Sequence, residues 1–277
     1  MSLRYKRIRK SPSVFLRMFG ITVSEFERIV DQFRPIYETH LIKKYRRPGR
    51  PFKLDLEDNL LMLFLYYRCY TTQMFVGYLF GIDDSRVCRI IQKLEPLLAQ
   101  ILKISKERVL KQEDLEQLID ATEQPIERPK KEQNAYYSGK KKRHTLKTEI
   151  RTTREGRIVH VSKTVPGAVH DFTLHKQEQP PPKRVHLYAD SGYQGLDKIH
   201  KHVEIPYKKP KNGTLTDEEK EYNHALAKVR VKIENVLAQL KVFRILSDRY
   251  RNKRRRYEDK FLIISGIVNL KNGFAAF

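Results

Sequence analysis

Two apolar segments of this sequence end on an aspartate, at Leu118-Ile119-Asp120 and at Leu187-Tyr188-Ala189-Asp190. Short apolar runs predict buried strands, and an unpaired charge inside a core is costly. In open α/β sheets, active sites lie outside the strand ends. Two neighbouring strands ending in this way would bring two carboxylates together, which is unfavourable unless a proton or a divalent cation lies between them. The alternative is that each aspartate caps the following turn.

The segments around the two aspartates predict a mixed sheet with helices. Alternating polar and apolar residues on either side of a Gly-Arg turn indicate a hairpin, and a Thr-Asp-Glu-Glu pattern indicates a capped helix. The expected elements are a hairpin of residues 142–153 and 157–164, a short helix from His170-Asp171, a strand near 203–206, a helix from Thr216 past Glu234 and an apolar helix at 261–270. This order is typical of an α/β domain.

Residues 55–103 have helical periodicity instead. The pattern predicts a first helix over residues 60–68, a second over 73–80 after a Thr71 or Thr72 cap, and a third over 86–94 after an Asp84 or Ser85 cap. A Gly81-Ile82-Asp83 turn before the third helix gives helix-turn-helix geometry. The outward face of that helix, which suits contact with DNA, carries Arg86, Arg89 and Lys93. A plain helical bundle with a basic face is the alternative.

The charge balance points to a polyanionic partner. The chain has 56 Lys and Arg against 33 Asp and Glu, a net charge of +23, and nucleic acid is the usual polyanion. An anionic membrane surface is the competing partner, but no apolar run approaches the roughly 20 residues that span a bilayer. The two cysteines, Cys69 and Cys88, lack paired metal-binding spacing and are expected to be small buried hydrophobes. We expect a cytoplasmic, nucleoid-associated protein without disulfides.

Residues 1–53 are especially basic, with 14 Lys and Arg against four acids, a balance of +10 (14 − 4). A helix is expected from Ser24 to Phe33, with Ser24 as its cap. The Pro- and Gly-containing segment 43–53 then interrupts regular structure. Its Arg47 and Arg50 suit a basic arm that lies in a DNA groove, and a solvated linker is the alternative.

A third acid lies in the expected late helix. Glu234 flanks an apolar stripe, and it shares a helix face with Arg230 and Lys241, which lie four residues before it and seven after it. A carboxylate beside the core stripe can lean towards the sheet edge. The alternative is a surface ion pair between Arg230 and Glu234.

Several of these features together resemble the DDE transposases of bacterial insertion sequences, in the branch shared with Harbinger-type elements. The resemblance rests on the two strand-terminal aspartates, the second followed by Ser-Gly-Tyr-Gln-Gly, on Glu234 in an R-x-x-x-E-x-x-x-x-x-x-K pattern, on YYSGKKKRHTLK at 136–147, and on VHD at 169–171. It covers nearly the whole chain. The spacings between the acids are 70 (190 − 120) and 44 (234 − 190), which leaves no large domain between the second and third.

The resemblance implies an RNase H-like mixed-sheet catalytic domain preceded by an all-α helix-turn-helix domain. The expected domains are a basic N-terminal helix and arm at 1–53, a helix-turn-helix domain at 54–110 and the catalytic domain at 111–277. The resemblance also implies two Mg²⁺ or Mn²⁺ ions held by Asp120, Asp190 and Glu234. These ions would support in-line attack on a DNA phosphorus, first by water and later by a DNA 3′-hydroxyl, with the opposite oxygen leaving.

The remaining roles follow from position around these acids. His170 and Asp171 are expected to orient a water or support a metal ligand, with a helix cap by Asp171 as the alternative. Phosphate contacts are expected from residues on the hairpin and the late helix, namely Lys140, Lys141, Arg143, Arg230 and Lys241. The expected partner is double-stranded DNA, both the terminal repeats of the element and its target, with a homodimer forming on DNA.

Two other functions share most of these features. A non-catalytic DNA-binding regulator derived from a transposase would use only the helix-turn-helix and the basic surface. A metal-dependent nuclease without strand transfer would use the same three acids. Loss of cleavage on changing Asp190 to Asn excludes the regulator, and a joining assay with pre-cut 3′-hydroxyl ends separates the nuclease from the strand transferase.

Overall fold

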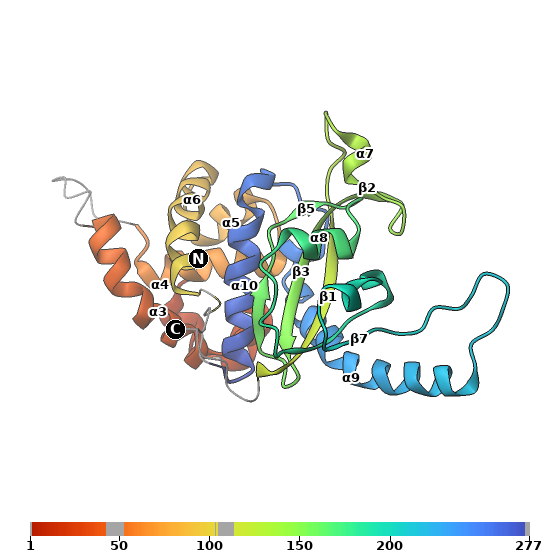
Figure 1. Ribbon diagram of the computed structural model, residues 1–277. Coiled ribbons are helices and arrows are strands. Elements are labelled where there is room, and N and C mark those ends of the chain that lie inside the picture. Colours follow the sequence, from red (N-terminus) through yellow and green to blue (C-terminus); the bar gives the residue numbers. More distant parts are fainter. Residues whose placement is uncertain (1, 43–52, 103, 105–113, 275–277) are drawn as a thin grey trace. The chain divides into compact units, whose positions relative to one another are not determined.

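The computed structural model describes residues 2–42, 53–102, 104 and 114–274 (Figure 1). By its contacts the chain forms two compact units, each discontinuous in sequence. The helical unit consists of Met1–Lys103, Leu240–Asp248 and Arg254–Phe277, and the sheet unit consists of Ile104–Gln239 and Arg249–Lys253. Residues 254–274 therefore pack with the helical unit, although the sequence assigns them to a domain of residues 111–277.

The helical unit is built around α4 (Leu56–Cys69), which is buried along almost its whole length. A helix that is apolar on nearly every side is stable only when other helices surround it. The helices and turns that accompany it are α1 (Tyr5–Ile8), α2 (Pro12–Phe19), α3 (Val23–Tyr37), η1 (Glu38–Ile42), α5 (Gln73–Phe80), α6 (Asp84–Ile101), η6 (Arg244–Leu246), η7 (Arg254–Arg256) and α10 (Tyr257–Lys271).

Helices α5 and α6 form the expected helix-turn-helix. The Thr72 hydroxyl caps α5 by accepting a hydrogen bond from the Phe75 N–H. The cap of α6 is Asp83, whose carboxylate accepts from the Arg86 N–H at 2.8 Å, so the prediction of an Asp84 or Ser85 cap was wrong by one or two residues. The helix also continues past residue 94, because Leu94 and Leu98 extend its buried stripe.

The cap of α3 also differs from the sequence prediction. Thr22, not Ser24, begins the helix, and it forms a reciprocal capping box with Glu25. The Thr22 side chain accepts from the Glu25 N–H at 3.2 Å, and the Glu25 carboxylate accepts from the Thr22 N–H at 2.7 Å. Both orphan donors are satisfied in this arrangement, which a cap at Ser24 would not achieve.

Helix α10 is joined to the other helices by a buried ion pair. The Lys260 Nζ atom lies 2.9 Å from Glu95 Oε1 in α6, and the Tyr67 hydroxyl in α4 donates to the same oxygen at 2.9 Å. The Lys260 and Glu95 side chains are only 3% and 1% exposed. Burial lowers the pKa of Lys260, which Glu95 opposes. Each charge therefore depends on the other, because an unpaired buried charge is strongly destabilising.

The sheet unit contains a mixed sheet with the order β2-β3-β1-β6-β7, and β4 and β5 also pair with β3. Neighbours β1 and β3 are antiparallel, whereas β1, β6 and β7 are parallel. The strands are β1 (Glu116–Pro125), β2 (Tyr137–Ser138), β3 (Arg143–Thr153), β4 (Ile158–Val161), β5 (Val165–Pro166), β6 (His186–Tyr188) and β7 (Val203–Glu204). The predicted hairpin of residues 142–164 corresponds to β3 and β4.

The apolar pattern predicts that strand β1 ends at Asp120, but the strand is longer than this. It continues to Pro125, because β3 pairs with it along its whole length as far as the Pro125–Thr145 pair. Asp120 therefore lies in the middle of a strand, and a turn cap at this position is excluded. Asp190, by contrast, follows β6 closely and caps the short 3₁₀ helix η4 (Ser191–Tyr193).

The two faces of the sheet carry different helices. On one face of β3 lie Lys147, Glu149 and Arg151, each no more than 7% exposed, with α8 (Asp171–Gln177) beside them. The apolar core of that face is the cluster of Ile119, Val185, Leu187, Ala189, Tyr193 and Leu196. Side chains alternate between faces, so Asp120 projects to the other face, where it meets α9 (Asp217–Lys241).

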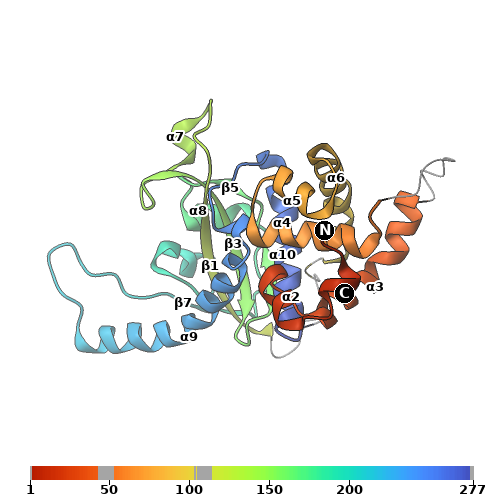
Figure 2. The same cartoon turned by 180° about the vertical axis from the view of Figure 1, so that it is seen from behind.

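Helix α9 begins with the expected capping box, in which Thr216 and Glu219 bond reciprocally at 3.2 and 2.9 Å. Figure 2 shows its first turns and the preceding loop projecting from the sheet. Among the described residues, no helix is both long and apolar enough to cross a bilayer. Both cysteines are free and half-buried.

Candidate active site

The carboxylates of Asp120 and Asp190 are brought together by the pairing of β1 with β6. These strands are parallel neighbours, and the last pair in register is Leu118 with Tyr188. Asp120 and Asp190 each lie two residues beyond this pair, along β1 and just after β6. The 70-residue spacing of the acids (190 − 120) therefore equals the offset of the paired strands (188 − 118). Residues at equal register lie side by side. The expectation of two adjacent carboxylates is therefore met by strand register.

The guanidinium of Arg230, from α9, lies against both aspartates. Its NH1 nitrogen is 3.5 Å from Asp190 Oδ1, and its NH2 nitrogen is 3.9 Å from Asp120 Oδ2. The Arg230 side chain is 14% exposed, and the two aspartates are 19% and 32% exposed. One positive charge is thus shared by two carboxylates in a largely buried position.

The Asp120 carboxylate is the more strongly perturbed of the two acids. Burial raises the pKa of Asp120 to about 6, with smaller contributions in the same direction from Asp190 and Asp171. Arg230 and a hydrogen bond from the Ala121 N–H, at 2.7 Å, oppose the increase. Near neutral pH this carboxylate is therefore charged but incompletely neutralised, a state that favours an additional cation.

Glu234 lies one helical turn after Arg230, on the same face of α9, and its side chain is exposed. Arg230 thus pairs with the two aspartates in preference to Glu234. Within the described ranges, no three His, Cys, Asp or Glu side chains converge as a metal site. Two adjacent carboxylates fit Mg²⁺ or Mn²⁺, which prefer oxygen ligands, but the structure does not bring Glu234 to them.

Asp171 lies at the start of α8 and supports the turn that carries Asp190. Its Oδ1 atom is 2.8 Å from Lys147 Nζ. Its Oδ2 atom lies close to Gly192, and a β-carbon added to that glycine would be only 2.6 Å from this oxygen. The same ammonium donates to the Val169 carbonyl at 2.5 Å and lies 3.8 Å from Glu123. Asp171 is therefore held firmly. The preceding His170 is exposed and makes no side-chain cap.

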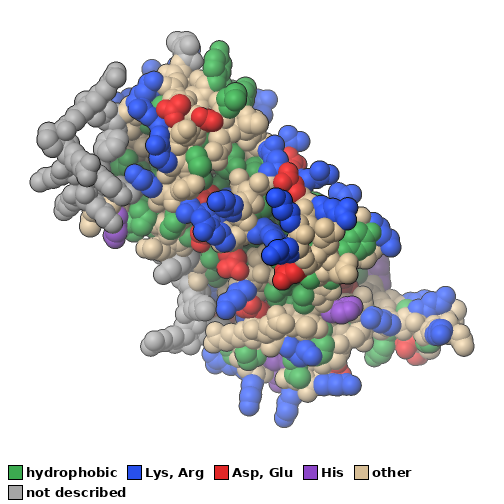
Figure 3. All heavy atoms as spheres, turned by 90° about the horizontal axis from the view of Figure 1, so that it is seen from above, with side chains coloured by type: hydrophobic (Ala, Val, Ile, Leu, Met, Phe, Trp, Pro, Cys, Tyr) green, Lys and Arg blue, Asp and Glu red, His purple; other side chains and the backbone are tan. Residues whose placement is uncertain are grey.

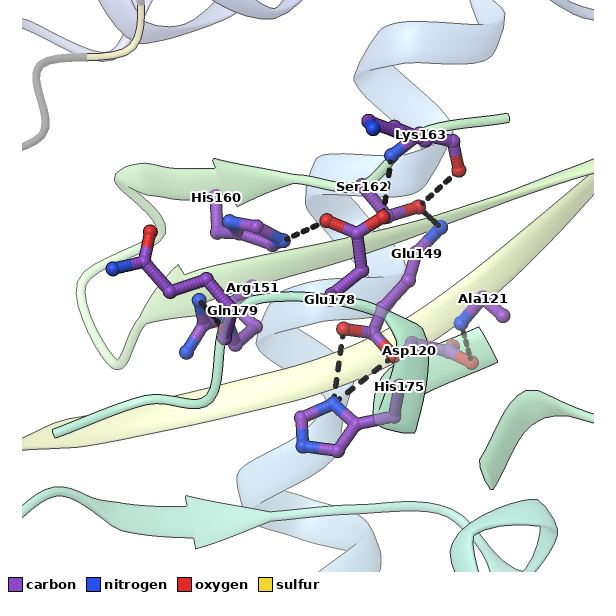
Figure 4. Close-up of polar contacts among 10 residues, drawn as sticks. All are labelled: Asp120, Ala121, Glu149, Arg151, His160, Ser162, Lys163, His175, Glu178 and Gln179. Carbon is purple, nitrogen blue, oxygen red and sulfur yellow. Dashed lines mark hydrogen bonds and ion pairs between the residues drawn. The ribbon is translucent and has the colours of Figure 1, made fainter. Parts of the chain in front are cut away.

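Behind this turn lies a buried pair that the sequence did not reveal. The His175 Nδ1 atom is 3.1 and 3.3 Å from the two oxygens of Glu149, and Figure 4 shows the carboxylate directed at the ring. These side chains are 3% and 0% exposed. The His175 ring also meets the buried ring of Tyr193 edge-on at 6.2 Å. Alternating charges on β3 were the available signal, but alternation by itself predicts a solvated face.

The expected DNA contacts on α6 are exposed. Arg86 and Arg89 lie 3.2 and 4.0 Å from Asp83, so their charges are partly neutralised without DNA. Of the other predicted contacts that are described, Lys93, Lys140, Lys141, Arg143 and Lys241 are exposed, whereas Arg230 is largely buried. Lys and Arg side chains are prominent on the face shown in Figure 3. The predicted arm residues Arg47 and Arg50 lie outside the described residues.

Comparison with known families finds two matching segments of the chain. Residues 119–269 match the family described as DDE superfamily endonuclease. Residues 52–104 match the family described as the helix-turn-helix of DDE superfamily endonuclease. The first match contains Asp120, Asp190 and Glu234, and the second contains α5 and α6.

Two curated relatives are similar over most of their length. The probable transposase of insertion sequence element IS702 from Microchaete diplosiphon is 40% identical over 261 residues, which is 92% of this chain and 93% of the relative. A transposase assigned to insertion sequence element IS112 of Streptomyces albus G is 27% identical over 208 residues, 73% of this chain and 75% of that protein. No solved structure matches the chain.

Proposed function

Because the chain belongs to the DDE superfamily endonucleases, we propose that it is an insertion-sequence transposase that cuts and joins DNA at the ends of its own element. The observation that carries this proposal is the pair formed by Asp120 and Asp190. Strand register aligns these two residues, and both carboxylates face the guanidinium of Arg230. The relatives described as transposases support the same activity.

Asp120 and Asp190 would hold a divalent cation, with Glu234 completing a two-ion set when DNA is bound. Bound Mg²⁺ or Mn²⁺ would lower the pKa of a water or hydroxyl nucleophile and stabilise the leaving oxygen of an in-line attack on phosphorus. Glu234 is exposed one helical turn after Arg230, the residue of the same helix face that reaches both aspartates. This supports a site that is completed on DNA.

The other residues of the chain would position the substrate and the acids. Lys147 and Asp171 fix the turn that carries Asp190, because both are held by short polar contacts. Lys140, Lys141 and Arg143 would bind phosphates of the DNA backbone, and such contacts position DNA without reading its sequence. Arg86, Arg89 and Lys93, on α6, would contact the terminal repeats.

Target DNA and two element ends must meet in one complex for joining, so we include a homodimer on DNA in the proposal. The cell compartment that suits this function is the cytoplasm at the nucleoid. A size measurement with and without duplex carrying the element ends tests the dimer. A complex of one chain with one DNA end, with no larger complex of two chains and two ends, would contradict the dimer.

A non-catalytic DNA-binding regulator is the second candidate function. The observation that favours it is that Glu234 is exposed and does not form a three-ligand group with the two aspartates. A nuclease without strand transfer would use the same acids as the transposase. The products of the reaction separate these functions: no cleavage, cleavage alone, or cleavage followed by joining of 3′-hydroxyl ends.

The experiment compares the wild type with Asp190→Asn on a plasmid that carries the complete element, with Mg²⁺ and then without it. We expect both proteins to bind DNA, and we expect cleavage only from the wild type and only when Mg²⁺ is present. The matched control is Asp197→Asn, which removes an exposed carboxylate seven residues away, in η5 (Leu196–Lys198), and should cleave normally. Cleavage by Asp190→Asn would refute the proposed site. Pre-cut ends supplied with target DNA then test joining.

A further inference from the structure

Arg230 is held loosely for a buried arginine. Its distances to the two aspartates, 3.5 and 3.9 Å, exceed the 2.7–2.9 Å typical of charge-assisted hydrogen bonds. Its Nε atom is buried and has no hydrogen-bond partner among the described residues. By comparison, the Lys147 ammonium on the other face of the sheet makes contacts at 2.8 and 2.5 Å. Arg230 therefore offsets part of the charge of the two acids without being fixed by them.

The position of the guanidinium is also the position that a metal ion requires. Both of its terminal nitrogens face carboxylate oxygens of Asp120 and Asp190, so a cation bound by these oxygens would lie against a like charge. A phosphate offers Arg230 what the aspartates do not, namely several acceptor oxygens for a bidentate contact and for the unsatisfied Nε–H. DNA and the two acids thus compete for one arginine.

We propose that Arg230 is a resident counterion that blocks divalent-metal binding until a DNA phosphate draws it away from Asp120 and Asp190. This inference rests on the proposed function, because it takes these aspartates as metal ligands. Its consequence is that metal binding and DNA binding assist each other. By linkage, each ligand must then raise the affinity of the other by the same factor. The protein would load its metal at the DNA and remain unloaded elsewhere.

The test measures Mn²⁺ binding by electron paramagnetic resonance at constant ionic strength, without DNA. Arg230→Gln removes the counterion, and we expect it to bind Mn²⁺ about tenfold more tightly than the wild type, within the usual range of coupling between sites. The matched control is Lys232→Gln, which removes one positive charge from an exposed position two residues along α9. It should bind Mn²⁺ like the wild type.

The second arm adds a saturating short DNA duplex of random sequence, since phosphate contacts do not depend on sequence. We expect the duplex to tighten Mn²⁺ binding by the wild type by about the same tenfold factor, and to change the affinity of Arg230→Gln less than about twofold. An equal response of both proteins to the duplex would overturn the inference. So would an unchanged or weaker Mn²⁺ affinity of DNA-free Arg230→Gln, which is the result of a purely supporting role.

Two further variants keep the outcome interpretable. Arg230→Lys preserves the charge, and its expected DNA-free Mn²⁺ affinity is that of the wild type. If Arg230→Lys binds Mn²⁺ as tightly as Arg230→Gln, charge is not the blocking property and the inference fails. Asp120→Asn tests the proposed function separately. If Mn²⁺ binds equally well to Asp120→Asn and to the wild type, the metal site itself is wrong, whatever the Arg230 variants show.

Discussion

Asp171 lies so close to Gly192 that a β-carbon on the glycine would be 2.6 Å from the Asp171 Oδ2 atom. The other oxygen of this carboxylate is 2.8 Å from Lys147 Nζ, so the aspartate cannot move away without losing its ion pair. The helix start at Asp171 and the turn after Asp190 are therefore in contact through a position that only glycine fills.

The first prediction concerns Gly192→Ala. The added methyl group must push the turn away from α8, at a cost of about 1–3 kcal/mol in unfolding free energy, as is typical of overpacking. Because Asp190 lies beside that turn, we expect a roughly 100-fold loss of cleavage rate, a loss that a displacement near 1 Å can cause. Denaturant unfolding and a plasmid cleavage assay measure the two effects.

The control for this variant is Gly139→Ala, because a β-carbon at Gly139 would have no neighbour within 4 Å. It should retain both stability and cleavage. Full activity of Gly192→Ala would show that the turn tolerates displacement and that its contact with Asp171 is unimportant for the reaction.

The second prediction concerns the pH dependence of stability of the metal-free protein. Asp120 has a pKa near 6 in the folded chain and an ordinary value of 3.8, so folding favours its protonated form. As pH rises from about 4 to 6, this group should lower the unfolding free energy by up to about 3 kcal/mol. Above pH 6 the cost stays constant and no further loss follows. Asp120→Asn should remove this loss, making the variant more stable than the wild type at pH 7.

Thermal unfolding at a series of pH values in chelator measures this difference. Because Arg230 opposes metal binding without DNA, Mg²⁺ should stabilise the wild type at pH 7 when a DNA duplex is also present, and Mg²⁺ should leave Asp120→Asn unaffected with or without the duplex. Parallel stability profiles of the two proteins between pH 4 and 7 would show that burial of Asp120 has no such cost.

The third prediction concerns the buried pair of Glu149 and His175. Changing His175 to Leu leaves the carboxylate without its partner in a fully buried position, and we expect a loss of about 3–5 kcal/mol in unfolding free energy. A double variant with Glu149→Leu removes the orphaned charge and should recover most of that loss. If the double variant is no more stable than the single one, the histidine stabilises the core by its packing against Tyr193 and not by pairing.

The fourth prediction separates two kinds of DNA contact. Replacing Lys140, Lys141 and Lys142 with Gln should weaken binding equally for all sequences and reduce the slope of log affinity against log salt by about 0.9 per lost phosphate contact. Arg89→Ala, on α6, should instead change the preference for the element ends over random duplex. Fluorescence anisotropy across a salt series measures both, and a sequence-dependent effect of the lysine changes would contradict this division.

Local patterns in the sequence predicted much of the fold, because local interactions determine those parts. The α5 boundaries, the Thr216 capping box and the β3–β4 hairpin follow from caps, turn residues and alternation. Asp120 was correctly expected beside Asp190, yet its strand runs on to Pro125. The pairing with β3 that extends it is a contact between distant segments, which the apolar pattern near Asp120 does not contain.

The surroundings of the acids were harder to predict for the same reason. Lys147, Glu149 and Arg151 lie at alternate positions of β3, and charges in such a pattern are typical of a strand with one solvated face. Their burial depends on α8, which covers that face. The Arg230 contact likewise depends on where α9 crosses the sheet, whereas sequence spacing alone suggested a partner at Glu234, one turn away.

The buried ion pair between Glu95 and Lys260 has a consequence for synthesis of the protein on the ribosome. Residues 2–102 emerge first, but the helix that covers Glu95 emerges only after the whole sheet unit has been made. Until then Glu95 lacks both its ammonium partner and the helix that buries it. The unit that contains the helix-turn-helix thus reaches its final packing last. A message truncated between codons 234 and 260 would encode the three acids without a stable unit to recognise DNA.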